Sequence, residues 1–116
     1  MFDLHEALGE LAGSLAGLRA AAVLETSGIE VATWGEADFE VLTAEVAELW
    51  RGAASAEALA PGRPESLEVR SRDGAWVVLP LAGDYLLAVL AGPDLPSGKA
   101  RFYGREWVLR HRGDFA

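Results

Sequence analysis

The side chains of this sequence include few of the groups that catalysis or metal binding requires. None of the 116 residues is a cysteine, which excludes thiolate nucleophiles, disulfides and cysteine-ligated zinc. The two histidines, His5 and His111, lie at opposite ends of the chain and lack the H-x-x-x-H or H-E-x-x-H spacing of a helical zinc site. We therefore predict no metal site and no bound cofactor.

Carboxylates are the remaining groups suited to acid–base chemistry, and they occupy helix positions. Glu45 and Glu48 fall on the expected solvent side of a helix, while Glu36, Asp38 and Glu40 are typical of a helix start. The phosphate-binding patterns G-x-x-x-x-G-K-[ST] and G-x-G-x-x-G and the nucleophile pattern G-x-S-x-G do not occur. We therefore predict no catalytic residue and a protein that is not an enzyme.

A long helix is predicted from Phe39, with Asp38 as its N-cap. Its apolar side chains form two neighbouring stripes at the helical period. The first, predicted to pack on a sheet, consists of Phe39, Leu42, Val46, Leu49, Ala53 and Ala56. The second consists of Thr43, Ala47 and Ala54, with Trp50 on the border between the two stripes. Together they make the apolar arc wider than one sheet contact requires.

The second stripe has two interpretations. In the first, the alanines are present only because alanine is a strong helix former and the chain is rich in it, so the second stripe contacts no partner. Alternatively, small side chains allow a second helix to approach closely, and Trp50 anchors the contact. We predict the second case, a dimer interface that includes Thr43, Ala47, Trp50 and Ala54.

Two strands and a helix precede this long helix. The apolar run Ala20–Leu24 leads through a turn into Ile29–Trp34, and Gly28 supplies the positive φ that a hairpin needs. Before them, leucines at positions 4, 8, 11, 15 and 18 recur at steps of four and three. This spacing predicts an amphipathic helix over residues 3–16.

Three strands follow the proline-containing connector at 60–64. The first, Ser66–Ser71, alternates apolar and charged residues and suits a sheet edge, whereas Ala75–Leu79 and Tyr85–Ala91 are continuously apolar and belong in the middle. A final helix begins near Ser97, and Ser97 or a neighbouring residue is its cap. The predicted order is α-β-β-α-β-β-β-α, in one domain spanning residues 1–116.

The strand at 66–71 is self-complementary. If two copies run antiparallel about Val69, Glu68 of one copy faces Arg70 of the other. We therefore predict that Leu67, Glu68, Val69 and Arg70 also belong to the dimer interface.

Charge is distributed unevenly along a chain of net charge −8. Residues 1–62 hold 11 acids and 2 arginines, whereas residues 63–116 hold 7 acids and 8 bases. The acidic first half argues against a nucleic-acid partner. The basic segment Lys99–Arg112 has two interpretations: a solvated helix face that complements the helix dipole, or a surface for an acidic partner or an anionic surface.

Composition also bears on location and source. The sequence has no apolar run near 20 residues and no signal sequence at its start, so we expect neither a membrane span nor secretion, and cytoplasmic location. It contains no Asn or Gln, and nine of its ten basic residues are Arg. A thermophilic source fits this bias, and a GC-rich genome fits it equally.

The predicted element order resembles the roadblock/dynein light chain family, which includes the bacterial gliding-motility partner of a Ras-like GTPase. The resemblance is carried by Leu18–Thr33, which looks like the family's strand, glycine turn and second strand, and by the long helix from Asp38. Residues 86–94 are similar to the family's closing strand and exit. The resemblance covers nearly the whole chain and rests on pattern, not on a catalytic motif.

This resemblance implies a five-stranded antiparallel sheet with the central helix on one face and the terminal helices on the other. It also implies a homodimer in which the central helix and the third strand pair across a two-fold axis. Members of the family are non-enzymatic platforms for small GTPases or for motor and scaffold subunits. The resemblance assigns no single residue here a role in GTPase activation.

The function it implies is therefore a non-catalytic homodimeric module that regulates or scaffolds a Ras-like small GTPase. One alternative is a structural subunit of a motor or sensory complex without GTPase regulation. Another is a small-molecule sensor domain, which would have a sizeable apolar cavity where this family has a filled core. Activation and passive tethering both fit the pattern, as do a homodimer and a heterodimer with a sister subunit.

Overall fold

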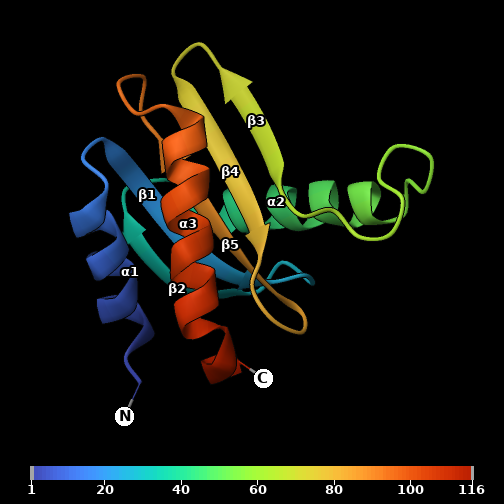
Figure 1. The fold of residues 1–116 in the computed structure, drawn as a ribbon, viewed down its shortest axis with the longest axis horizontal. Helices are drawn as coiled ribbons and strands as arrows, with labels where there is room; N and C mark the ends of the chain where they lie inside the picture. Colours follow the sequence, from blue (N-terminus) through green and yellow to red (C-terminus); the bar gives the residue numbers. More distant parts are fainter. Residues whose placement is uncertain (1, 116) are drawn as a thin grey trace.

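One antiparallel sheet with helices on both faces makes up the fold in the computed structural model, which describes residues 2–115 (Figure 1). The elements are α1 (Leu4–Ser14), β1 (Leu18–Glu25), β2 (Glu30–Gly35), α2 (Phe39–Ala54), β3 (Leu67–Ser71), β4 (Gly74–Pro80), β5 (Tyr85–Ala91), α3 (Ser97–His111) and the 3₁₀ helix η1 (Arg112–Phe115). The predicted order α-β-β-α-β-β-β-α and the predicted α+β fold class are confirmed.

The five strands lie in the order β2-β1-β5-β4-β3. The apolar strand β5 is central, since Val89 pairs with Ala21 of β1 on one side and with Val77 of β4 on the other. The charged strand β3 is at an edge, as its alternating pattern predicts. The buried side chains of β1 and β5 point to both faces of the sheet, so both faces need a cover.

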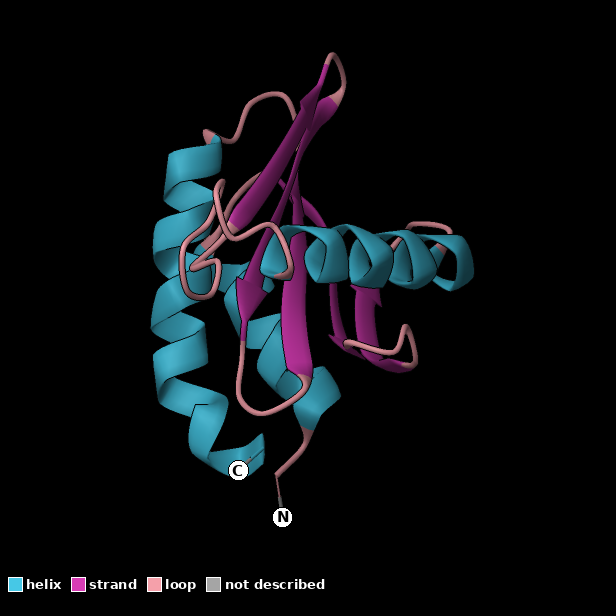
Figure 2. Ribbon diagram, turned by 90° about the vertical axis from the view of Figure 1, so that its right-hand side faces the viewer, coloured by secondary structure: helices cyan, strands magenta, loops and turns pink. Residues whose placement is uncertain are grey.

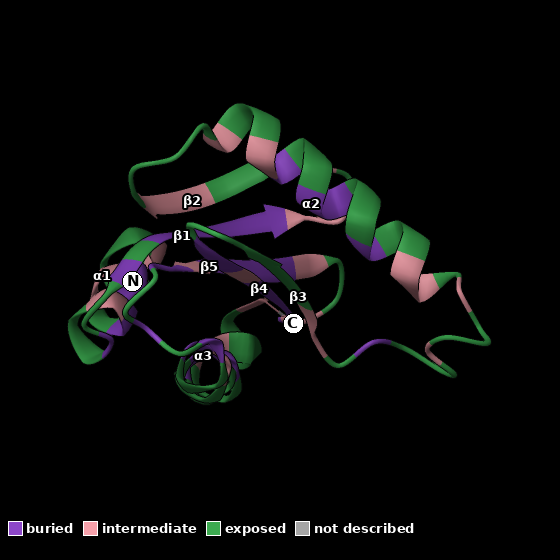
Figure 3. Cartoon of the chain, turned by 90° about the horizontal axis from the view of Figure 1, so that it is seen from above, coloured by how far each residue is buried: buried purple, intermediate pink, exposed green. Residues whose placement is uncertain are grey.

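The terminal helices cover one face of the sheet and α2 covers the other, as Figures 2 and 3 show. Between the sheet and the terminal helices lies the larger core, with Leu8 and Leu11 from α1 and Trp107 from α3. The smaller core under α2 consists of Leu24, Val46, Ala47, Trp50, Val78, Leu86 and Ala88. The predicted placement of the three helices is therefore confirmed.

Helix α2 begins at Phe39 with Asp38 at the N-cap position, as predicted, but the carboxylate of Asp38 makes no capping hydrogen bond. Helix α3 begins at Ser97, as predicted, with Pro96 at the N-cap position, and no side chain caps it. The cap that forms is at α1, where the carboxylate of Asp3 accepts a 3.1 Å hydrogen bond from the main-chain N–H of Glu6. Since α2 and α3 bury one face each, packing stabilises them without these caps.

None of the helices within residues 2–115 combines the length and the apolar content that a bilayer crossing requires.

Candidate interaction surface

α2 packs on the sheet through the stripe that was predicted to contact a second copy. Thr43, Ala47 and Trp50 are 2%, 1% and 2% exposed, respectively. Ala47 and Trp50 belong to the small core with side chains of β1, β4 and β5, and Ala54 is half-buried. The assignment of Thr43, Ala47 and Trp50 to an uncovered dimer stripe is therefore wrong, because the chain's own sheet covers them.

The sizes of the side chains explain why α2 is rotated so that the stripe with Trp50 faces the sheet. Trp50 is the bulkiest side chain on the helix, and placing it under the helix buries the most apolar area. Small residues next to it let the helix approach the β1–β2 turn: a Cβ on Gly28 would lie 3.6 Å from the Cα of Ala44. The hydroxyl of Thr43 donates a 2.9 Å hydrogen bond to the carbonyl of Phe39, so its burial leaves no unpaired donor.

The stripe that was predicted to pack on the sheet does so only in part. Val46 is 5% exposed in the small core, and Leu42 packs against that core. Leu49 is 43% exposed, and Ala53 and Ala56 are half-buried, so the C-terminal part of the stripe is open. A groove of about 670 Å³ runs along this side of α2. It is lined by Glu45, Glu48, Leu49, Gly52, Ala53, Ala56, Leu59 and Leu67.

β3 continues this apolar surface beyond the helix. Leu67 and Val69 pair with Val78 and Trp76 of β4, and these residues lie on the face that α2 covers only in part. Val69 is 49% exposed. Among the strands within residues 2–115, β3 has β4 as its single neighbour, so its outer edge presents unpaired main-chain groups.

We call this combined region the open surface. It consists of Leu42, Leu49, Ala53, Ala56, Leu67, Val69 and Trp76. An apolar helix flank beside an unpaired strand edge is suited to association with another chain, through packing and through main-chain hydrogen bonds.

The charged side chains of β3 lie on the other face of the sheet, beside α3. The carboxylate of Glu68 is 3.6 Å from the guanidinium of Arg70 and 3.6 Å from that of Arg101. Arg70 also donates a 2.6 Å hydrogen bond to the hydroxyl of Ser97. Glu68 thus has cationic partners within its own chain, and its pairing with Arg70 of a second copy stays a prediction.

Both histidines contact structural groups. The Nδ1 atom of His5 is 2.9 Å from the carbonyl oxygen of Thr33, which connects α1 to β2. The ring of His111 stacks at an angle on Trp107, with a centroid distance of 4.7 Å, and its Nδ1 is 3.7 Å from the carboxylate of Asp114. In the part of the chain that the structure describes, no three His, Asp or Glu side chains converge as metal ligands would.

The basic segment at 99–112 forms most of α3 and is mainly solvent-exposed. Arg101 contacts Glu68, whereas Lys99, Arg105, Arg110 and Arg112 are exposed. Phe102 and Leu109, at 60% and 55% exposed, lie on the same outer side of the helix. The buried side of α3 consists of Ser97, Ala100, Gly104, Trp107 and Val108.

A sheet in the order β2-β1-β5-β4-β3, with one helix crossing one face and the two terminal helices on the other, is the α+β arrangement of Roadblock/LC7 structures. The Roadblock/LC7 domain of Streptomyces avermitilis superposes with a TM-score of 0.89 over 98% of both chains, at 19% sequence identity. This chain therefore has the Roadblock/LC7 fold, and the resemblance found in the sequence is confirmed.

Two structures of the gliding-motility protein MglB share this fold. MglB in a tetrameric arrangement matches with a TM-score of 0.81 at 19% identity, over 89% of this chain and 80% of that one. The gliding protein MglB of Thermus thermophilus matches with a TM-score of 0.78 at 21% identity, over 96% of this chain and 88% of that one. In sequence, no protein-family model and no curated protein matches the chain.

Proposed function

We propose that this chain forms a homodimer and acts as a non-catalytic interaction module that regulates or scaffolds a Ras-like small GTPase. The observation that carries the proposal is the open surface, which leaves the apolar flank of α2 and the edge of β3 uncovered in a single copy. A second copy of the chain presents the same two features in complementary positions about a two-fold axis.

Dimerisation through the open surface follows from the shapes of its two parts. Gly52 and Ala53 line the groove beside α2, and their small side chains allow a second helix to come close. Leu49 and Val69 are each nearly half-exposed in one copy and would lose that exposure at the two-fold contact. Antiparallel pairing of two β3 strands about Val69 would satisfy the main-chain groups of both edges.

The fold and the family resemblance support a GTPase partner. MglB, which shares the fold, is a gliding-motility protein, and the resemblance implies that proteins of this kind bind a Ras-like GTPase. We place the complex in the cytoplasm. Action through binding alone is in keeping with the side chains present, since both histidines are engaged in structural contacts.

The packing of the larger core argues against the small-molecule sensor. Leu8, Leu87 and Trp107 are at most 1% exposed and occupy the space between the sheet and the terminal helices. A sensor domain needs a cavity there to hold its ligand. The scaffold alternative predicts the same dimer. It differs from GTPase regulation only in that binding to the partner does not depend on the nucleotide that the GTPase carries.

The test mixes the purified chain with each Ras-like GTPase encoded in the same genome, loaded in turn with GDP and with a non-hydrolysable GTP analogue. We expect calorimetry to show tighter binding to one nucleotide state, and Leu49→Glu to weaken that binding if the dimer is the binding form. Binding without nucleotide dependence would favour scaffolding. GTP hydrolysis by the chain alone would refute the non-catalytic assignment.

A further inference from the structure

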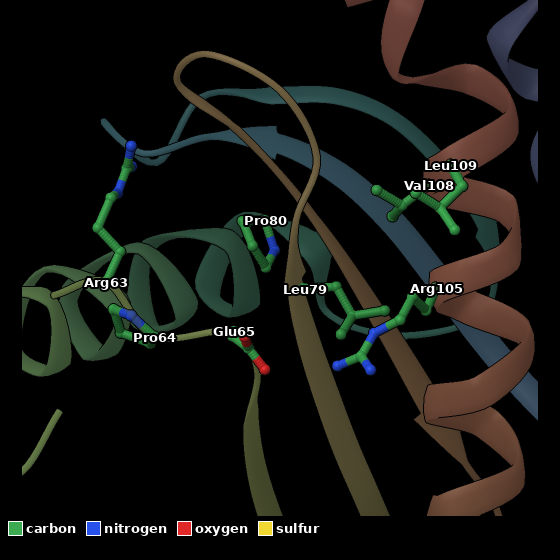
Figure 4. A pocket seen from close by; sticks show the side chains of 8 residues that line it. All are labelled: Arg63, Pro64, Glu65, Leu79, Pro80, Arg105, Val108 and Leu109. Carbon is green, nitrogen blue, oxygen red and sulfur yellow. The ribbon is translucent and has the colours of Figure 1, made fainter. Parts of the chain in front are cut away.

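A second groove lies on the opposite face of the sheet from the open surface, between α3 and the connector that leads into β3 (Figure 4). Its volume is about 440 Å³, and it is lined by Arg63, Pro64, Glu65, Leu79, Pro80, Arg105, Val108 and Leu109. An adjoining hollow of about 200 Å³ shares Arg63, Pro64 and Pro80 and reaches Gly83 in the β4–β5 turn. We call the two together the α3 groove.

The register of the sheet creates this groove. β3 begins opposite Val78, so Leu79 and Pro80 at the end of β4 have no β3 residue beside them. α3 packs tightly on β4 at this level, because a Cβ on Gly104 would lie 2.9 Å from the Cδ1 of Leu79. The end of β4 and one side of α3 therefore form an apolar trough that the connector closes on its far side.

Two arginines border the trough. Figure 4 shows the guanidinium of Arg105 beside Leu79, with Glu65 on the facing connector. Arg63 belongs to the lining of both hollows. Within residues 2–115 neither Arg63 nor Arg105 has an ion-pair partner, whereas Arg70 and Arg101 share Glu68. The α3 groove thus carries two arginines against one carboxylate, in a chain whose net charge is −8.

We propose that the α3 groove binds an extended segment of a partner protein that carries apolar side chains next to a carboxylate. Apolar side chains of that segment pack on Pro80 and Leu109, and its carboxylate forms a bidentate ion pair with Arg105. Two adjoining hollows give the site an elongated outline, which suits an extended peptide better than a compact ligand. A dimer formed through the open surface has one such groove in each copy.

The shape of the groove distinguishes this partner from an anionic membrane, the other surface that cations on α3 attract. The groove is recessed between α3 and the connector, and its accessible apolar lining consists of half-buried Pro80 and exposed Leu109. A side chain of a peptide enters such a recess, whereas a flat bilayer contacts only the outer residues such as Phe102.

The probe for the test is the peptide acetyl-Ala-Leu-Glu-Leu-Asp-Leu-Ala-amide, titrated to millimolar concentration into the ¹⁵N-labelled protein. We expect saturable shifts of the main-chain amides of Arg63, Glu65 and Leu79 and of residues 81–83 and 105–109. Arg105→Glu should weaken binding at least tenfold, and a peptide with Gln and Asn in place of its two acids should bind at least fivefold more weakly. Arg72→Glu is the matched control, because it makes the same charge change at the exposed β3–β4 turn and should leave binding unchanged.

Three results would overturn the proposal. The first is an absence of shifts in the α3 groove, or shifts at Leu49 and Leu67 instead. The second is equal affinity for the acidic and the amide peptide, or unchanged affinity of Arg105→Glu. The third is a protein that does not bind the peptide but sediments with phosphatidylglycerol vesicles, with the Arg105→Glu variant failing to sediment with them. That result would assign the arginine to a membrane contact. None of these measurements involves a GTPase, so this inference and the proposed function fail independently.

Discussion

The indole N–H of Trp107 donates a 2.8 Å hydrogen bond to the main-chain carbonyl of Ala7, across 100 positions of sequence. The two residues are 1% and 4% exposed, so the bond lies inside the larger core. It connects α3 directly to α1, in addition to the packing of each helix on the sheet. The terminal helices therefore form one layer in which a change to either helix affects the other.

Trp107→Phe should reveal the contribution of this bond. The substitution keeps an aromatic ring in the core but removes the donor to Ala7, so we expect the free energy of unfolding to fall by about 1–3 kcal/mol. Urea denaturation at fixed protein concentration measures the change. Tyr103→Phe on the exposed side of α3 is the control and should change stability by less than about 0.5 kcal/mol. Equal effects of the two substitutions would contradict the assigned role.

Trp50→Ala should act on the core of each copy. Because Trp50 is 2% exposed under α2, its truncation leaves a cavity and should cost about 3–5 kcal/mol of unfolding free energy. The comparison is Leu49→Ala at the adjacent position, which should affect the dissociation constant of the dimer more than the unfolding of a single copy. An unchanged urea midpoint for Trp50→Ala would show that the side chain is not in the core.

Leu49→Glu should weaken the dimer. Burying a leucine side chain contributes about 1.5–3 kcal/mol to the free energy of association. Because a two-fold dimer buries Leu49 of both copies, the dissociation constant should rise at least tenfold. Sedimentation velocity over a range of concentrations measures it. Leu109→Glu is the matched control: Leu109 is 55% exposed on the opposite face of the sheet, and its substitution should leave the dimer intact. A wild-type chain that is monomeric at high micromolar concentration would rule out the proposed dimer.

Hydrogen exchange tests the pairing of β3 with its copy. The amides of Leu67–Ser71 should exchange slowly in the dimer, since both sides of the strand would then be hydrogen-bonded. β2, at the other edge of the sheet, provides the internal reference and should exchange faster at its outward amides. Similar rapid exchange along β2 and β3 would argue for a free β3 edge.

Two glycine substitutions should change stability in opposite directions. Gly9 lies within α1 with no neighbouring atom within 4 Å of an added Cβ, so Gly9→Ala should stabilise the protein by up to about 1 kcal/mol. Gly35 has a φ of +83°, and an added Cβ would overlap the carbonyl of Arg19 in β1. Gly35→Ala should therefore destabilise it. Thermal unfolding of the two variants gives the comparison, and shifts of the same sign would contradict it.

Local pattern was sufficient to predict the elements and their order. The alternation in β3, the continuous apolar runs of β4 and β5 and the glycine turn at Gly28 are short-range properties, and each one restricts the backbone where it occurs. The edge position of β3 and the inner positions of β4 and β5 followed from the same runs, because a strand that is apolar on both sides is covered on both faces of the sheet.

The sequence by itself therefore determined the elements, the inner positions of β4 and β5 and an apolar arc on α2 too wide for one contact. Only the tertiary structure decided how that arc is used, because a helical period sets the width of the arc but not its rotation about the helix axis. Burial of Trp50 against the sheet selected the rotation and left Leu49 and its neighbours open. The α3 groove likewise depends on Leu67 pairing with Val78, a register between strands that neither strand's own pattern specifies.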